Sequence, residues 1–138
     1  MYTNVIINNF HYIKGGSEAV YFNMADMFVK AGHSVVFFST TDSRNRDYGS
    51  NKYFVEQNNS VNPLLGAMRY VYNGSAKRAL ERLIATEKPD IAHIHLFWGG
   101  LSSSILGVLK RHNIPVVHTA HDYRMVCPAY TFRRVDGT

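Results

Sequence analysis

The stretch "NVIINNFHYIKGGSEAVYFNMADMFVKAGHSVVFFST", residues 4–40, decides the fold class. It opens and closes with short apolar runs, residues 4–9 and 34–40, and such continuous runs are typical of strands buried on both faces of a parallel sheet. Between the runs lie apolar residues at the spacing of one helical face: Val20, Met24, Met27, Phe28 and Ala31. Gly32 then ends this helix. The stretch therefore predicts a strand, a helix and a second strand.

The same alternation returns in the second half of the chain. "KPDIAHIHLFW" (88–98) predicts a strand, "GGLSSSILGVLKRHN" (99–113) a helix and "IPVVHTAHD" (114–122) a strand. Strands that alternate with helices favour an α/β fold, a Rossmann-like parallel sheet with helices on both faces and right-handed crossovers.

The middle of the chain reads differently. Residues 41–60 are polar, so we expect mainly a mobile surface loop with at most one short strand around residues 53–55. Residues 63–87 predict a long helical segment, which Asn73-Gly74 can break into two.

Composition narrows the class of protein. The 138 residues suffice for one domain, and the formal charge of +5 suits an anionic ligand, a nucleic acid or an anionic membrane. The fifteen basic residues are scattered and accompany no nucleic-acid-binding motif, so we expect no nucleic-acid partner. Cys127 is the only cysteine, which excludes an internal disulfide and fits a reducing cytoplasm. The sequence shows neither a signal peptide nor an apolar run long enough to span a bilayer.

Three loops with polar or aromatic side chains follow predicted strands. They are "NNFHYIKGGSE" (8–18), "HLFWGG" (95–100) and "HDYRMVCP" (121–128). In open parallel sheets, ligands bind beyond the carboxyl ends of the strands, where successive connections part to opposite faces. We therefore expect the three loops to converge on one binding edge.

The first of these loops carries Gly15, Gly16 and Ser17 at the start of a helix. Glycines let a ligand approach the backbone closely, and the free amides at a helix start favour a phosphate. The loop matches neither the dinucleotide fingerprint nor a Walker A loop. The alternative is a tight turn whose glycines supply positive φ, with Ser17 as the helix cap.

Four histidines lie in or after the last two strands. His93 and His95 are two apart and so share one face of their strand, but neighbouring carboxylates at metal-ligand spacing are not evident, and we expect no metal. We interpret His93 and His118 as buried histidines with ordinary hydrogen-bond partners. His95 and His121 lie nearest the strand ends and are the candidate site residues.

Three of these stretches together carry a resemblance to a known family. Residues 15–40, 88–98 and 114–128, in this order and spacing, resemble the N-terminal domain of the retaining glycosyltransferases of family 4, which have the GT-B fold. The resemblance implies a two-domain enzyme with its active site in the cleft between the domains. The chain, 1–138, would be the N-terminal, acceptor-side domain, truncated and without the nucleotide-sugar domain.

The resemblance also implies site residues. Gly15 and Gly16 map to a loop that approaches the diphosphate of the donor, and His121 maps to a catalytic histidine close to the transferred sugar. Around them we expect these substrate-binding residues: Ser17, His95, Trp98, Asp122, Tyr123 and Arg124. Trp98 and Tyr123 are aromatic residues that can stack on a sugar or a base.

The function that the resemblance implies is retaining transfer of a sugar from a nucleotide-sugar to a glycan or lipid-linked acceptor, in bacterial surface polysaccharide or lipopolysaccharide synthesis. The donor is a substrate, and no cofactor is expected. The alternative is a Rossmann-like nucleotide or small-molecule binding domain that catalyses nothing.

The sequence of the helical segment, residues 63–87, is compatible with either a membrane-bound helix or an ordinary surface helix. Basic residues lie among apolar ones there, and a basic amphipathic helix can lie on the anionic inner face of the cell membrane, where a lipid-linked acceptor would be found. The alternative is an ordinary surface helix with one packed and one solvated face.

Overall fold

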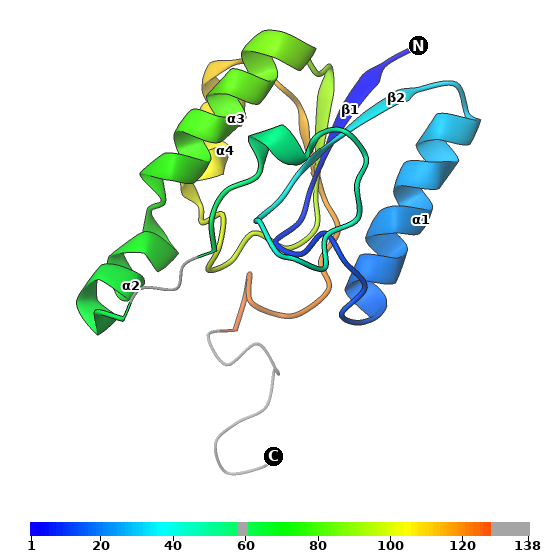
Figure 1. Ribbon diagram of the computed structural model, residues 1–138. Coiled ribbons are helices and arrows are strands. Elements are labelled where there is room, and N and C mark those ends of the chain that lie inside the picture. The colour runs from blue at the N-terminus through cyan, green and yellow to red at the C-terminus, as the bar shows by residue number, and fades with distance from the viewer. Residues whose placement is uncertain (58–60, 128–138) are drawn as a thin grey trace.

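The computed structural model describes residues 1–57 and 61–127. Within these ranges the chain forms a parallel sheet flanked by helices, which confirms the predicted α/β class (Figure 1). The elements are, in chain order, β1 (Thr3–Ile7), α1 (Gly16–Lys30), β2 (Ser34–Phe38), a 3₁₀ turn η1 (Asn51–Tyr53), α2 (Pro63–Val71), α3 (Gly74–Glu87), β3 (Ile91–Ile94), α4 (Ser104–Arg111) and β4 (Val116–His118).

The strands of the described sheet lie in the order β2-β1-β3-β4, and every pairing is parallel. The register aligns Ile7 with Phe38 of β2 on one side and with Ile94 of β3 on the other. The connection from β1 leads to one edge of the sheet, whereas β3 and β4 extend it in the other direction. The chain thus has its switch point between β1 and β3, at the centre of the sheet.

The two faces of the sheet bury different residues because side chains alternate along each strand. Val5 and Ile7 point to the face that α3 and α4 cover, together with the larger apolar core. Ile6 and Phe37 point to the opposite face and pack against Tyr21 and other residues of α1. Figure 1 shows α1 alone on one side of the sheet, with α3 and α4 on the other.

The helical segment after residue 60 is broken where the sequence predicts it. Asn73 is buried and separates α2 from α3, since its side-chain oxygen accepts hydrogen bonds from the amides of Ser75 and Ala76 at 3.0 and 3.1 Å. Its side-chain amide donates to the carbonyl of Gly100, 2.7 Å away. Asn73 is therefore both the N-cap of α3 and a tie to the loop after β3.

The expected surface loop before α2 is partly inside the protein. Tyr53 and Val55 are buried, and the Tyr53 hydroxyl donates to the carboxylate of Glu87 at 2.6 Å. The expectation of at most one short strand around residues 53–55 is met by less than a strand, because the segment forms η1 and then a single parallel bridge between Thr40 and Val55. One bridge holds the segment against the end of β2 without adding a strand to the sheet.

Candidate functional site

The three polar loops meet at the carboxyl edge of the sheet, as the topology rule predicts. The β1 loop binds the β3 loop, because the side-chain oxygen of Asn8 accepts from the amide of Leu96 at 3.0 Å and that of Asn9 accepts from the amide of Leu101 at 3.2 Å. The β3 loop in turn contacts the β4 loop through His95 and His121, whose Nδ1 and Nε2 atoms lie 2.8 Å apart. Side chains from three strand ends are thus linked into one surface.

The glycines before α1 are not required by the backbone. Gly15 is the N-cap residue and has φ −166° and ψ −161°, an extended conformation that other residues adopt as well. Gly16 is not among the glycines with positive φ, and a Cβ placed on it would have no heavy atom within 4 Å. The alternative of a positive-φ turn is therefore wrong. The absence of side chains here leaves the backbone open to a close approach by a ligand.

Ser17 does not cap the helix. No side chain caps the start of α1; the Ser17 hydroxyl instead donates to the carboxylate of Glu18 at 2.8 Å. Glu18 is buried and also accepts from the side-chain amide of Asn8 at 3.5 Å. These contacts turn the carboxylate inward, so the outer surface at the helix start consists of the exposed Gly15 and Gly16.

Three histidine rings form a column on the α1 face of the sheet. The ring of His93 stacks on that of His95 with centroids 4.7 Å apart, and the ring of His95 stacks on that of His121 at 5.1 Å. His95 is fully buried, whereas His121 is partly exposed. His121 therefore forms the outer end of the column, and His95 lies beneath it rather than at the surface expected for a substrate contact.

The other histidines of this region have ordinary partners. Nε2 of His93, which is buried, lies 2.7 Å from the hydroxyl of Thr119. Nε2 of His118 donates to the carbonyl of His95 at 3.1 Å, and the His118 ring lies on the other face of the sheet near Phe97. Both residues have ordinary hydrogen-bond partners, as interpreted from the sequence, but only His93 is buried; the expected burial of His118 is wrong, because it lies on the last strand of the described sheet and is partly exposed.

The buried histidines are neutral at pH 7. Burial, together with the smaller effect of the neighbouring histidines, lowers the pKa of His95 to about 3. Burial also lowers the pKa of His11 to about 4, with a contribution from the positive charge of Arg46. For His121, burial again lowers the pKa, although the charge of Glu18 acts in the opposite direction. These rings therefore serve as neutral hydrogen-bonding groups.

We expect the chain to lose stability as the pH falls from 6.5 towards 4. In the unfolded chain a histidine binds a proton near pH 6.5, but His11 and His95 resist protonation while folded until about pH 4 and about pH 3. Because the unfolded state then binds more protons, each of the two lowers the free energy of unfolding by about 1.4 kcal/mol per pH unit in this window.

Denaturant unfolding at pH 7.5, 6.0 and 5.0 measures this dependence, with His11→Phe as the comparison. The substitution keeps an aromatic ring in the cluster formed with Tyr21, Phe22 and Phe37 but removes one titrating group. It should flatten the decline below pH 6.5. An identical slope in both proteins would contradict the assignment of His11 as a buried neutral residue.

The loop after His121 brings together two more of the predicted residues. The carboxylate of Asp122 accepts from the amide of Arg124 at 3.0 Å and forms an ion pair with its Nε at 3.2 Å. Tyr123, between them, is 56 % exposed. Asp122 and Arg124 thus engage each other in this structure, and Tyr123 has the exposure that ring stacking on a ligand requires. The last residue of the predicted loop, Pro128, lies outside the described residues.

Trp98 lines a cavity of about 290 Å³ at the ends of β1 and β3. Its ring stacks on Phe97 with centroids 4.5 Å apart. Tyr70 from α2 contributes a second aromatic ring, and Asn9 and Gln57 contribute amides. Aromatic rings next to amide groups are the lining expected for a sugar, since each pyranose presents apolar C–H faces and hydroxyl edges.

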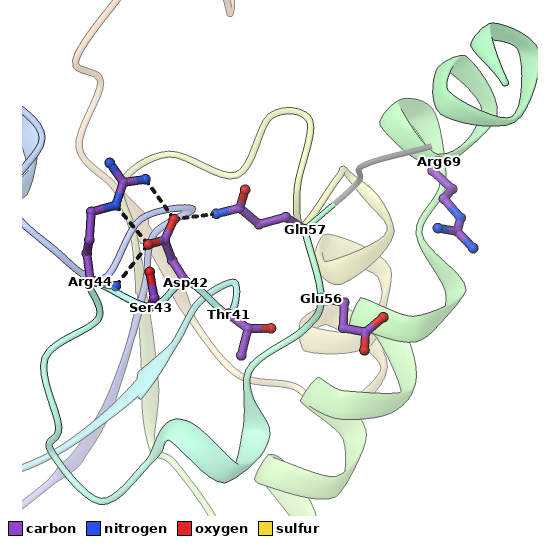
Figure 2. Close-up of a pocket in the computed structure, with 7 residues that line it drawn as sticks. All are labelled: Thr41, Asp42, Ser43, Arg44, Glu56, Gln57 and Arg69. Atoms are coloured by element: carbon purple, nitrogen blue, oxygen red, sulfur yellow. Dashed lines mark hydrogen bonds and ion pairs between the residues drawn. The ribbon is translucent and has the colours of Figure 1, made fainter. Parts of the chain in front are cut away.

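A second, more polar cavity of about 660 Å³ adjoins the first and was not predicted from the sequence. Both cavities share Gln57, and Figure 2 shows the polar one beyond the end of β2. Here the carboxylate of Asp42 accepts two hydrogen bonds of 2.8 Å from the guanidinium of Arg44 and one of 3.1 Å from Gln57. These bonds hold the pKa of Asp42 well below its usual range. The sequence held one signal for this cavity: the polar residues "TDSR" directly follow the apolar run that forms β2, and so lie at a strand end.

Two kinds of feature are missing from the described part of the chain. Residues 1–57 and 61–127 contain no group of three or more His, Cys, Asp or Glu side chains placed to hold a metal ion. In the same ranges, none of the helices combines the length and apolar content needed to cross a bilayer.

The fold defines a Rossmann-like domain, in which polar and aromatic loops meet at the carboxyl ends of the strands of a parallel sheet. Residues 14–134 match the model of the Glycosyltransferase Family 4 domain, and the chain belongs to this family. This confirms the resemblance drawn from the sequence motifs.

A curated relative extends this comparison to a longer protein. The chain is 26 % identical over 143 aligned positions to a Klebsiella pneumoniae protein described as an uncharacterized 42.6 kDa protein in cps region. The alignment covers 91 % of the chain and 38 % of the length of that relative. The chain thus spans well under half of the length of the relative it matches.

Proposed function

We propose that the chain is the acceptor-side domain of a glycosyltransferase that transfers a sugar, with retention of configuration, from a nucleotide-sugar to a glycan or lipid-linked acceptor. Membership of Glycosyltransferase Family 4 supports the reaction class. The cps region named for the Klebsiella relative supports a place in bacterial surface polysaccharide or lipopolysaccharide synthesis. The proposed reaction takes place in the cytoplasm and uses no metal and no cofactor.

The observation that carries the proposal is the meeting of three loops at one sheet edge. The exposed Gly15 and Gly16 belong to the loop after β1, the partly exposed His121 to the loop after β4, and the aromatic cavity beside Trp98 lies at the ends of β1 and β3. In the proposed division of labour, the glycines approach the donor diphosphate and His121 contacts the transferred sugar. The cavities beside Gln57 hold the acceptor, and the remaining donor contacts come from a second domain.

Calorimetric titration with nucleotide-sugars tests the division of labour. The 138-residue chain, titrated with UDP-, GDP- and dTDP-sugars, should show no binding in the micromolar range, because most donor contacts are assigned to the second domain. The full-length protein should bind one member of the panel. Micromolar binding to the chain alone would contradict this division and favour the alternative, a nucleotide-binding module that catalyses nothing.

The second part of the proposal is contact with the anionic inner face of the membrane through α2. None of the nine residues of α2 is buried, and three large apolar side chains, Leu64, Met68 and Val71, are 71, 62 and 67 % exposed. The alternative of a helix with one packed face holds for α3, which buries Leu80 and four further residues, but not for α2. A helix whose apolar side chains are largely exposed, and which carries Arg69, suits an interface between lipid and anionic head groups.

Co-sedimentation with liposomes tests this contact. The chain should sediment with vesicles that contain anionic lipid and much less with neutral ones, and Leu64→Ser combined with Met68→Ser should abolish the difference. Met27→Ser is the matched control, because Met27 is 68 % exposed on α1, away from α2. Equal recovery with both lipid compositions would contradict membrane contact.

A further inference from the structure

His95 is the most firmly held of the histidines near the sheet edge. Its backbone amide donates to the carbonyl of Ile7 at 2.8 Å, and its own carbonyl accepts from Nε2 of His118 at 3.1 Å. The ring lies in the stack with His93 and meets the ring of Tyr21 edge to face, at 5.5 Å and 82°. Backbone and ring are thus fixed from several sides, which leaves little freedom for a different rotamer.

The hydrogen bond from this fixed ring determines how His121 is oriented. Nδ1 of His95 and Nε2 of His121 lie 2.8 Å apart, so one atom carries the proton and the other accepts it. The second nitrogen of His121, Nδ1, has no hydrogen-bond partner among the described residues and is not among the enclosed polar atoms. A ligand at the sheet edge can therefore reach His121 through Nδ1.

The buried nitrogen of His95 indicates which ring donates. Nε2 of His95 is buried and has no partner among the described residues. If His121 donated, a neutral His95 would carry its proton on that Nε2, and a buried N–H would stay unpaired. If His95 donates, Nε2 is only an unpaired acceptor, and unpaired buried donors are the rarer case in proteins.

We infer that His95 is a positioning residue that donates from Nδ1 to Nε2 of His121 and thereby holds His121 as the tautomer that presents Nδ1–H outward. His121 then acts towards its ligand as a hydrogen-bond donor, and the group it recognises is an acceptor, such as a hydroxyl or ring oxygen of the sugar. The identity of the ligand in this inference rests on the proposed function, whereas the tautomer of His121 does not.

The tautomer is measured by NMR on the 138-residue chain with ¹⁵N-labelled histidine. Long-range proton–nitrogen correlations should show Nδ1 protonated and Nε2 unprotonated in both His95 and His121. In His95→Phe the fixed tautomer of His121 should give way to a mixture. In His95→Asn, whose side-chain amide can donate from the position of Nδ1, it should return. His93→Phe, on the same strand and face, should leave His121 unchanged. A protonated Nε2 on His121 in the wild type, or an unchanged His121 in His95→Phe, would overturn the inference.

Kinetics of the full-length enzyme separate the inference from the proposed function. His95→Phe should lower kcat about tenfold with little change in the KM for the donor, and His95→Asn should recover most of the loss. Combined with His121→Ala, His95→Phe should cause no further loss, because both act through one contact. If His121→Ala itself leaves turnover unchanged, the proposed role of His121 fails while the NMR result still decides the positioning. If turnover depends on His121 but not on His95, the positioning fails.

Discussion

His121→Ala in the full-length enzyme is expected to lower kcat by roughly tenfold to a thousandfold, the range observed when one transition-state contact is removed. His121 is the partly exposed end of the histidine column, and its Nδ1 is the ring atom open to a ligand. The affinity for the donor should change less, since most donor contacts are assigned to the second domain. Steady-state kinetics with donor titration measure both quantities.

Two comparisons make this result specific. His121→Asn tests whether an amide donor replaces part of the imidazole contact, and it should retain more activity than the alanine variant. Thermal unfolding of the variant chain should stay close to that of the wild type, because His121 is only partly buried. Wild-type kcat in His121→Ala would contradict a contact between this side chain and the reacting sugar.

Gly16→Val should lower turnover at least tenfold while leaving the fold intact. Apart from its chain neighbours and the backbone of its own helix, a Cβ on Gly16 would have no heavy atom within 4 Å, and the backbone needs no positive φ, so the fold itself provides no reason for glycine. A branched side chain would, however, stand on the exposed surface where the donor diphosphate is proposed to approach. Turnover and the unfolding midpoint, measured on the same preparation, separate these effects.

Gly107→Val supplies the control for this experiment. Gly107 lies in the exposed part of α4, and an added Cβ there also has no neighbour within 4 Å. It should therefore match Gly16→Val in stability, apart from a small gain because valine has a higher helix propensity than glycine, and keep wild-type turnover. Undiminished turnover in Gly16→Val would contradict a phosphate-facing loop.

The sheet was predictable because its strands are buried on both faces. Val5, Ile6 and Ile7 form a continuous apolar run, which is typical of a strand covered on both faces. The helical spacing located α1, but the predicted apolar face was wrong: Val20 and Met27 are exposed, and α1 buries Tyr21, Phe22 and Ala25 instead. The break at Asn73 was predictable for a local reason as well, since Asn-Gly is a typical turn signal and asparagine is a favoured N-cap for the next helix. Elements whose structure depends on nearby residues in the sequence could thus be predicted from the sequence.

Features that depend on contacts between residues far apart in the sequence could not be predicted. Tyr53 is buried in the apolar core with its hydroxyl bonded to Glu87, and the polar cavity brings Asp42 together with Gln57. The pairing of His95 with His121 likewise arises only when two loops close on each other. The residue types and their approximate location at the strand ends could be predicted, but the assignment of His95 to a buried position required the structure.

The position of β1 at the centre of the sheet imposes an order on folding during synthesis. β1 can pair with β2 once Phe38 has left the ribosome, but its second partner ends only at Ile94. At the usual pace of translation, the interval amounts to roughly three to eleven seconds. Throughout it, Val5 and Ile7 lack the cover of α3 and α4, and the open edge of β1 is a template for unwanted pairing. The nascent chain is therefore most exposed to aggregation, and to chaperone binding, while its middle third is being made.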